Sequence, residues 1–382
     1  MKKILTAMSL LLVPTVANAG EPIKKGDFTF KYSGLAGAYY GVMETKNQNN
    51  LDNMSNRWVQ RTDGSVSGEY AIDEETKAML FANYTLAFSE HNTAYRNGDW
   101  RFYPHAELDS KKFGTVKAGY TYNVAVTAHQ GAKDITFLGI GDSNIIYFLT
   151  NPNWNNGKHA VAFTTPKSTA LMDDGRALKF SYITPKFANT QLGFSYTPDN
   201  PNRRGMVSRY AHYEKKEDAY VFAMNNEWET GFGKILTSAG YGVFNRTDKS
   251  MSVGAGFEKG NFNVRTAYKK SYIDGKKDPI TTVKIDNELP AYFDNYREGE
   301  AWDMSVGYKF NDSFKSNLAY LYSSATNTRH NNQIYILSNV YTYNKYIDLY
   351  LIGAHIDAKG LKKDSTANNK GYAGIVGIGL KF

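Results

Sequence analysis

The feature that most constrains the fold is a long series of segments in which apolar and polar residues alternate with a period of two. The series runs from Phe28 to Phe382, and connectors rich in Asn, Asp, Gly, Lys and Pro separate its members. Side chains of a β-strand point alternately to opposite faces, so this pattern predicts half-buried strands. The alternation is unclear in 218–229 and 333–343. We predict sixteen strands, at about 28–42, 57–72, 77–90, 100–109, 114–122, 176–184, 190–197, 218–229, 234–246, 250–258, 262–273, 301–310, 315–325, 333–343, 346–357 and 372–382.

The two faces of these segments differ in a way that indicates a membrane barrel. In 301–310, Trp302 and Tyr308 share one face, while Asp303, Ser305 and Lys309 share the other. Aromatic residues lie at both ends of the apolar faces, where a membrane interface favours them. A soluble β-sandwich also alternates, but its strands are shorter and its connectors lack the alternation of short and long that this chain shows. We therefore predict an all-β fold, a transmembrane antiparallel β-barrel of about sixteen strands, an even number as in closed bacterial barrels.

Composition agrees with many short strands and excludes several other classes. The 382 residues include 29 tyrosines, 33 glycines and no cysteine, and aromatic residues are enriched in strands. No segment after the N-terminus approaches the ~18 to 20 apolar residues of a transmembrane helix. The net charge of +8 is modest and spread along the chain, so we expect no nucleic-acid partner.

The N-terminus predicts export. Lys2 and Lys3 precede an apolar stretch from Ile4 to Val13, and Ala17-Asn18-Ala19 forms a small-x-small cleavage site. This is the pattern of a secretory signal peptide. We expect residues 1–19 to be removed, which leaves residues 20–382 as the barrel.

Several motifs match a known family. Leu178–Phe187 and Gln191–Asp199 form a hairpin with a Tyr-x-Thr-Pro turn, and Lys112–Tyr120 reads as the strand before a long loop. With the terminal Phe382, these motifs resemble Gram-negative general porins, particularly the alphaproteobacterial type, over essentially all of the mature sequence. Many relatives have a basic or His-containing pair before the final Phe, whereas here only Lys381 precedes it.

The resemblance implies a homotrimer in the outer membrane of a Gram-negative bacterium, in contact with lipid and lipopolysaccharide. It also implies that the barrel-assembly machinery reads Phe382. The longest connector, about 123–175, would then be the third extracellular loop, folded into the lumen as a constriction loop. Independently, its apolar stretches Ile135–Leu138 and Ile145–Leu149 need a wall to pack on, and a connector of this length inside a compact domain is expected to be functional.

Charged residues suggest how the lumen would select solutes. The connector carries Asp134 and Asp142, and also Asp173 and Asp174, which form an ordinary turn sequence with the next glycine. Carboxylates facing cations across a narrow eyelet would set a transverse field and bias which ions enter. The candidate constriction residues are Lys31, Arg57, Arg61, Arg101 and Lys117 on the wall and Asp134 and Asp142 on the loop.

We expect a general diffusion porin that passes ions and small hydrophilic solutes. The alternative is a substrate-specific channel for sugars or anions, with Tyr39 and Tyr103 among its candidate contacts. An outer-membrane enzyme is disfavoured, since no catalytic constellation or cofactor motif is found and the seven histidines are scattered without metal-ligand spacing. A receptor for energised uptake would need a plug domain before Phe28, for which only a few residues are left. We expect no cofactor and no metal.

Overall fold

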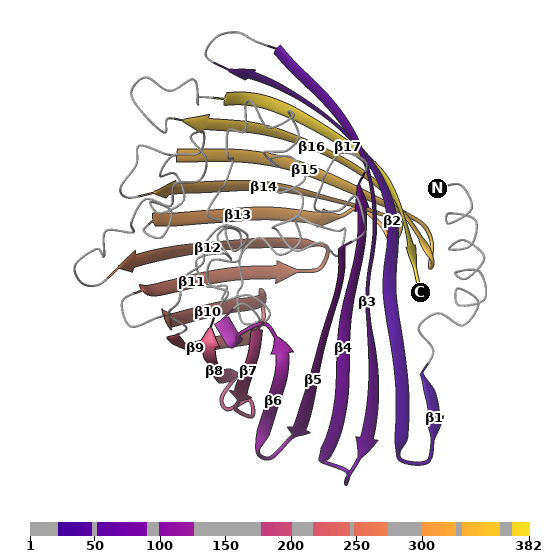
Figure 1. Ribbon diagram of the computed structural model, residues 1–382, viewed down its shortest axis with the longest axis vertical. Helices are drawn as coiled ribbons and strands as arrows, with labels where there is room; N and C mark the ends of the chain where they lie inside the picture. The colour runs from indigo at the N-terminus through magenta and orange to yellow at the C-terminus, as the bar shows by residue number, and fades with distance from the viewer. Residues whose placement is uncertain are drawn as a thin grey trace.

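The structure is a computed structural model, and it describes residues 22–47, 52–89, 99–125, 177–200, 217–244, 248–273, 299–325, 331–359 and 369–382 (Figure 1). β-Strands make up almost all of this part of the chain. They are β1 (Ile23–Lys25), β2 (Phe28–Asn47), β3 (Asp52–Ala71), β4 (Thr76–Ser89), β5 (Asp99–Ser110), β6 (Gly114–Thr121), β7 (Ala177–Ile183), β8 (Thr190–Asn200), β9 (Glu217–Thr230), β10 (Gly233–Phe244), β11 (Asp248–Lys259), β12 (Phe262–Ile273), β13 (Gly299–Lys309), β14 (Phe314–Ala325), β15 (Asn331–Asn344), β16 (Ile347–Lys359) and β17 (Asn369–Lys381). Among the described residues, no helix is long and apolar enough to cross a membrane.

The strands from β2 to β17 form a closed antiparallel barrel. Each pairs with the next in the chain, and β17 pairs with β2, so the predicted sixteen-stranded barrel is confirmed. Figure 1 shows β10 to β17 side by side in chain order, with β2 next to β17. The short strand β1, which the sequence pattern did not predict, pairs with the start of β2, with Ile23 opposite Phe30. Barrel closure gives each of the described strands β2 to β17 a neighbour on both sides, as a lipid environment demands.

Most of the exposed large apolar side chains point out of the barrel, as the alternation predicted. Trp302 is 43% exposed and Tyr372 is 65% exposed, whereas Asp303, on the inner face next to Trp302, is fully buried. Five rings on β13 to β17 follow one another across the outer face, with centroid separations of 4.7 to 6.2 Å. They are Trp302, Tyr320, Tyr335, His355 and Tyr372. Such a row is typical of the interfacial aromatic girdle of a membrane barrel.

The end of the chain closes the seam between the first and last strands of the barrel. The backbone N–H of Gly34 donates to the carbonyl of Phe382 at 2.6 Å, and the N–H of Phe382 donates to the carbonyl of Gly34 at 2.9 Å. The ring of Phe382 lies over Gly34, where a Cβ atom would come within 2.5 Å of ring atom Cζ. Glycine is therefore needed at this position if the ring is to reach the neighbouring strand.

The lengths of the connectors distinguish the two ends of the barrel. Short turns, such as 72–75, 111–113 and 260–261, lie at one end, and the long connectors, including 122–176, 201–216 and 274–298, lie at the other. The connector at 245–247 is a short one at the long-connector end. The predicted signal peptide and nearly all of the predicted constriction loop lie outside the described residues, which include only Asn123–Ala125 of that loop.

Candidate functional site: the inner face of the barrel

Two of the predicted constriction residues, Lys31 and Lys117, lie on the inner face and are ion-paired. Lys31 Nζ on β2 lies 2.7 Å from Oε1 of Glu69 on β3. Lys117 Nζ on β6 lies 2.7 Å from Oε1 of Glu107 on β5, and Nε2 of His105 lies 2.8 Å from the same oxygen. Both lysines are three residues from the start of their strands, close to the short turns.

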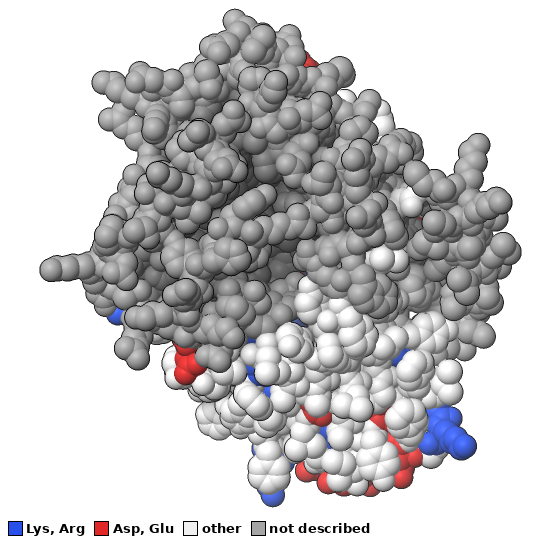
Figure 2. Space-filling view, in the orientation of Figure 1, with Lys and Arg blue, Asp and Glu red and all other residues white. Residues whose placement is uncertain are grey.

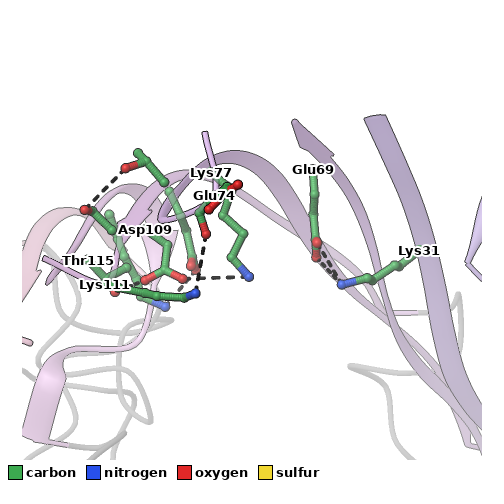
Figure 3. A network of polar contacts seen from close by, with 11 residues as sticks. Lys31, Glu69, Glu74, Lys77, Asp109, Lys111 and Thr115 are labelled. Carbon is green, nitrogen blue, oxygen red and sulfur yellow. Dashed lines mark hydrogen bonds and ion pairs between the residues drawn. The ribbon is translucent and has the colours of Figure 1, made fainter. Parts of the chain in front are cut away.

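Further charge pairs lie at the same end of β4 to β6. Lys77 Nζ lies 3.7 Å from Oδ2 of Asp109, and the hydroxyl of Thr115 donates to Oδ1 of Asp109 at 2.6 Å. Figure 3 shows these contacts beside the Lys31 and Glu69 pair, all on strands that end in short turns. Figure 2 shows Asp and Glu close to Lys and Arg at the lower edge of the described surface, where the turns of these strands lie in Figure 1.

Ion pairs continue around the short-turn end of the barrel. We call the whole set the paired-charge ring. Its members are Lys31–Glu69, Lys77–Asp109, Lys117–Glu107, Lys186–Glu227 at 3.2 Å, Lys234–Glu227, Arg265–Glu258 and Lys381–Asp348 at 2.9 Å. Each cation contacts a carboxylate, so the fields of opposite charges largely cancel at distances greater than their separation. This end of the lumen is therefore highly charged but nearly neutral in sum.

The three predicted arginines occupy strand positions farther from the short turns. Strand register places Arg61 opposite Gly37 and Ala87, Arg101 opposite Thr85, and Arg57 opposite Gly41. Arg61 and Arg101 thus flank β4 at positions two residues apart, and strand alternation assigns all three arginine positions to the inner face. Their side chains lie outside the described residues, as do Asp134 and Asp142. The eyelet composed of these residues stays a prediction.

The first residues of the long connector pack inside the barrel. The backbone N–H of Val124 donates to Oγ of Ser195 on β8 at 3.0 Å, and Oγ of Ser195 lies 2.7 Å from Oγ of Ser181 on β7. Val124 is only 3% exposed and packs with Ala125 and Val221. Neither Ser195 nor Val221 is among the predicted site residues. For Val221 a signal was present, because it lies in 218–229, one of the two segments in which the alternation is unclear.

A second part of the inner face is apolar and buried. Ile334 and Ile336 on β15, Ile352 on β16 and Ile375 on β17 are at most 3% exposed. Ile375 is a large apolar residue on the inner face of β17, where Ala373, Gly377 and Gly379 are small. Tyr39, a candidate sugar contact in the substrate-specific alternative, is also buried, with its ring centroid 6.0 Å from that of Tyr350. A buried ring offers no face on which a solute could stack.

The described residues contain no group of three His, Cys, Asp or Glu side chains placed to hold a metal ion. What they offer is a charged, partly exposed wall over β2 to β6, and a wall over β15 to β17 that combines buried isoleucines with the Lys381–Asp348 ion pair near the short turns. Such a surface can bind or repel ions.

Comparisons with known proteins agree with this arrangement. A family model described as Gram-negative porin matches residues 5–361. A search of curated protein sequences gives no significant match. Among solved structures, the in-vitro folded outer-membrane protein OmpT of Vibrio cholerae is similar, with a TM-score of 0.57, 11% identity and coverage of 95% of this chain and 100% of that one. OmpF of Salmonella typhi, in a complex with daunomycin, is similar with a TM-score of 0.57 and 11% identity, covering 95% of this chain and 100% of that one. An anion-selective porin of Comamonas acidovorans has a TM-score of 0.56 and 12% identity, covering 93% of this chain and 100% of that one.

Proposed function

The chain belongs to the Gram-negative porin family, and we propose that it is a general diffusion porin that passes ions and small hydrophilic solutes passively. Membership of the family identifies an outer-membrane channel rather than an enzyme, and the closed barrel agrees with this. The proposal concerns the kind of channel.

The observation that carries the proposal is the pairing of charges on the inner face. A channel specific for anions needs a continuous track of cations, and a sugar channel needs a track of exposed aromatic rings. The Lys31 and Lys117 side chains instead lie 2.7 Å from the carboxylates of Glu69 and Glu107, and Tyr39 is buried. A wall of alternating charge favours water and polar solutes without selecting one of them.

Selectivity is proposed to arise where the connector meets the wall. Arg57, Arg61 and Arg101, together with Lys31 and Lys117, would face Asp134 and Asp142 across the lumen. An ion in a narrow pore loses part of its hydration, and fixed charges compensate for that loss according to the ion's sign. Because Lys31 and Lys117 have carboxylate partners, we assign each of them a smaller share of the field than an unpaired cation would have.

Assembly is proposed by resemblance to the family. The channel would be a homotrimer in contact with lipopolysaccharide, and it would reach the membrane through the barrel-assembly machinery after removal of residues 1–19. The pairing of Phe382 with Gly34 supports a role of the chain end in barrel closure.

The experiment is single-channel recording of the purified protein in a planar bilayer under a salt gradient, with and without added sugars or phosphate. A trimeric general porin gives large steps in groups of three, and its conductance scales with salt and ignores added solutes. A conductance that saturates, or that one solute blocks at low concentration, shows a binding site in the pore and replaces the proposal with the substrate-specific channel.

The eyelet assignment has its own test in the same recordings. Asp134→Asn or Asp142→Asn should shift the reversal potential toward anions, and Arg57→Ala, Arg61→Ala or Arg101→Ala should shift it toward cations. If neither set changes the reversal potential, the constriction lies elsewhere.

A further inference from the structure

The long connector reverses direction as soon as it leaves β6. β6 ends at Thr121, yet three residues later the N–H of Val124 donates to Ser195 at 3.0 Å. Strand register places Ser195 opposite Ser181, and Ser181 opposite Lys117. Val124 therefore contacts the inner wall in the hydrogen-bonding row that contains Lys117, which lies four residues before the end of β6.

The wall is shaped to receive this turn. Gly193 on β8 lies under Val124, where a Cβ atom on Gly193 would come within 2.9 Å of Cβ of Val124. On the neighbouring strand β9, Ala219 and Val221 are fully buried, and together with Ala223 they pack against Val124 and Ala125. A small residue at 193 and short side chains on β9 thus leave a depression into which Val124 fits.

Hydrogen bonds hold the turn at this place. Ser195 is 0% exposed, and its hydroxyl is shared between the Val124 N–H and Ser181 Oγ. The next N–H, that of Ala125, donates to Oδ1 of Asn123 at 3.0 Å. Buried backbone N–H groups need partners, and β8 supplies one of the two from a strand that is itself held in the barrel.

We infer that Gly193 and Ser195 are positioning residues that fix where the long connector enters the lumen and thereby set the free cross-section and ion preference of the channel. The inference rests on the proposed function, since it assumes that the connector from 123 narrows the lumen. Neither residue needs to touch a solute. Both act through Val124, whose hydrogen-bond partner Ser195 lies in the same hydrogen-bonding row as Lys117.

The test compares Gly193→Val and Ser195→Ala with two matched controls in bilayer recordings. Gly353→Val adds the same side chain where a Cβ meets no atom within 4 Å, and Ser252→Ala removes a hydroxyl from the inner face of β11, away from the connector. We expect Gly193→Val to change single-channel conductance by about twofold or more and to shift the reversal potential, since conductance and selectivity follow the pore lining. Ser195→Ala should give a smaller change in the same direction, with more frequent current fluctuations, and both controls should match the unmodified protein.

Folding is checked by circular dichroism and by the temperature at which the assembled protein dissociates, read by gel electrophoresis. If Gly193→Val does not fold, Ser195→Ala decides the question. Unchanged conductance and reversal potential in folded position-193 and position-195 variants overturn the inference, as does an equal change in the controls. These outcomes are distinct from a failure of the proposed function, in which the unmodified protein itself forms no general diffusion channel.

Discussion

Removing one member of an inner-face ion pair should change ion selectivity, whereas removing both should not. Lys117 and Glu107 are the best pair for this test, because their charged atoms lie 2.7 Å apart and their side chains are 25% and 11% exposed. Lys117→Met leaves the Glu107 carboxylate in contact with Nε2 of His105 at 2.8 Å. Recording above the pH range in which histidine ordinarily titrates avoids a compensating positive charge.

The size of the effect follows from Coulomb's law with screening. A unit charge about 10 Å from a passing ion contributes about 0.4 kcal/mol in water. At 0.1 M salt, with a screening length of about 10 Å, this falls to about 0.15 kcal/mol. The charge attracts one sign of ion and repels the other, so the cation-to-anion permeability ratio should rise about 1.7-fold at 0.1 M and about 2.7-fold at 0.01 M.

The assay is the reversal potential across a bilayer at the two salt concentrations. Glu107→Gln should shift selectivity by a similar factor toward anions, and the double variant Lys117→Met with Glu107→Gln should return to the value of the unmodified channel. If the double variant keeps the shift of the single lysine variant, the pair does not cancel. If neither single variant changes the reversal potential at low salt, these side chains do not lie beside the ion path.

Two further predictions concern the seam and a turn. Deleting Phe382 removes two backbone hydrogen bonds to Gly34, so the free energy of unfolding of the barrel should fall by about 2 kcal/mol. The variant should therefore unfold at a lower temperature by circular dichroism. Phe310→Ala, which removes an exposed ring away from the seam, should have a smaller effect, and equal unfolding midpoints for the two variants would refute the role of the seam. The hydrogen bond from Lys309 lowers the pKa of Asp312 in the turn after β13, so this carboxylate should stay ionised at more acidic pH than an ordinary aspartate. Lys309→Met should raise the pKa of Asp312 back toward its usual value in a carbon-13 NMR titration, and an unchanged pKa would contradict the assigned cause.

The outward half of the fold could be predicted from the sequence because lipid imposes a simple rule on it. Large apolar residues such as Trp302 and Tyr372 must face the membrane, so each strand shows its outer face in every second residue. All sixteen predicted strands were confirmed, with boundaries that differ mainly where strands extend toward the long connectors, as β3 does to Asp52. The short strand β1 was missed because three residues carry too little pattern to detect.

The inner half was harder to predict because the surroundings of its side chains depend on contacts with neighbouring strands rather than on exposure to lipid. Strand alternation placed Lys31 and Lys117 on the inner face, but alternation along one strand does not reveal that Glu69 and Glu107 lie next to them. Those contacts depend on the stagger between neighbouring strands, which the turns set and which a single strand does not encode. The burial of Ser195 likewise depends on a connector that leaves a strand two positions away around the barrel.

The two segments whose alternation is unclear carry information of a different kind. In β9, Val221 is buried on the inner face while Phe222 is exposed on the outer face, and in β15 Ile336 and Leu337 show the same arrangement. A strand loses its period of two when both faces are shielded from water, one by lipid and the other by protein. Loss of alternation therefore marks inner-face positions that are both apolar and buried, such as Val221 and Ile336. The strands of β2 to β6 keep polar and charged inner residues, so the water-filled path, and with it the ion selectivity, is expected to follow that side of the barrel.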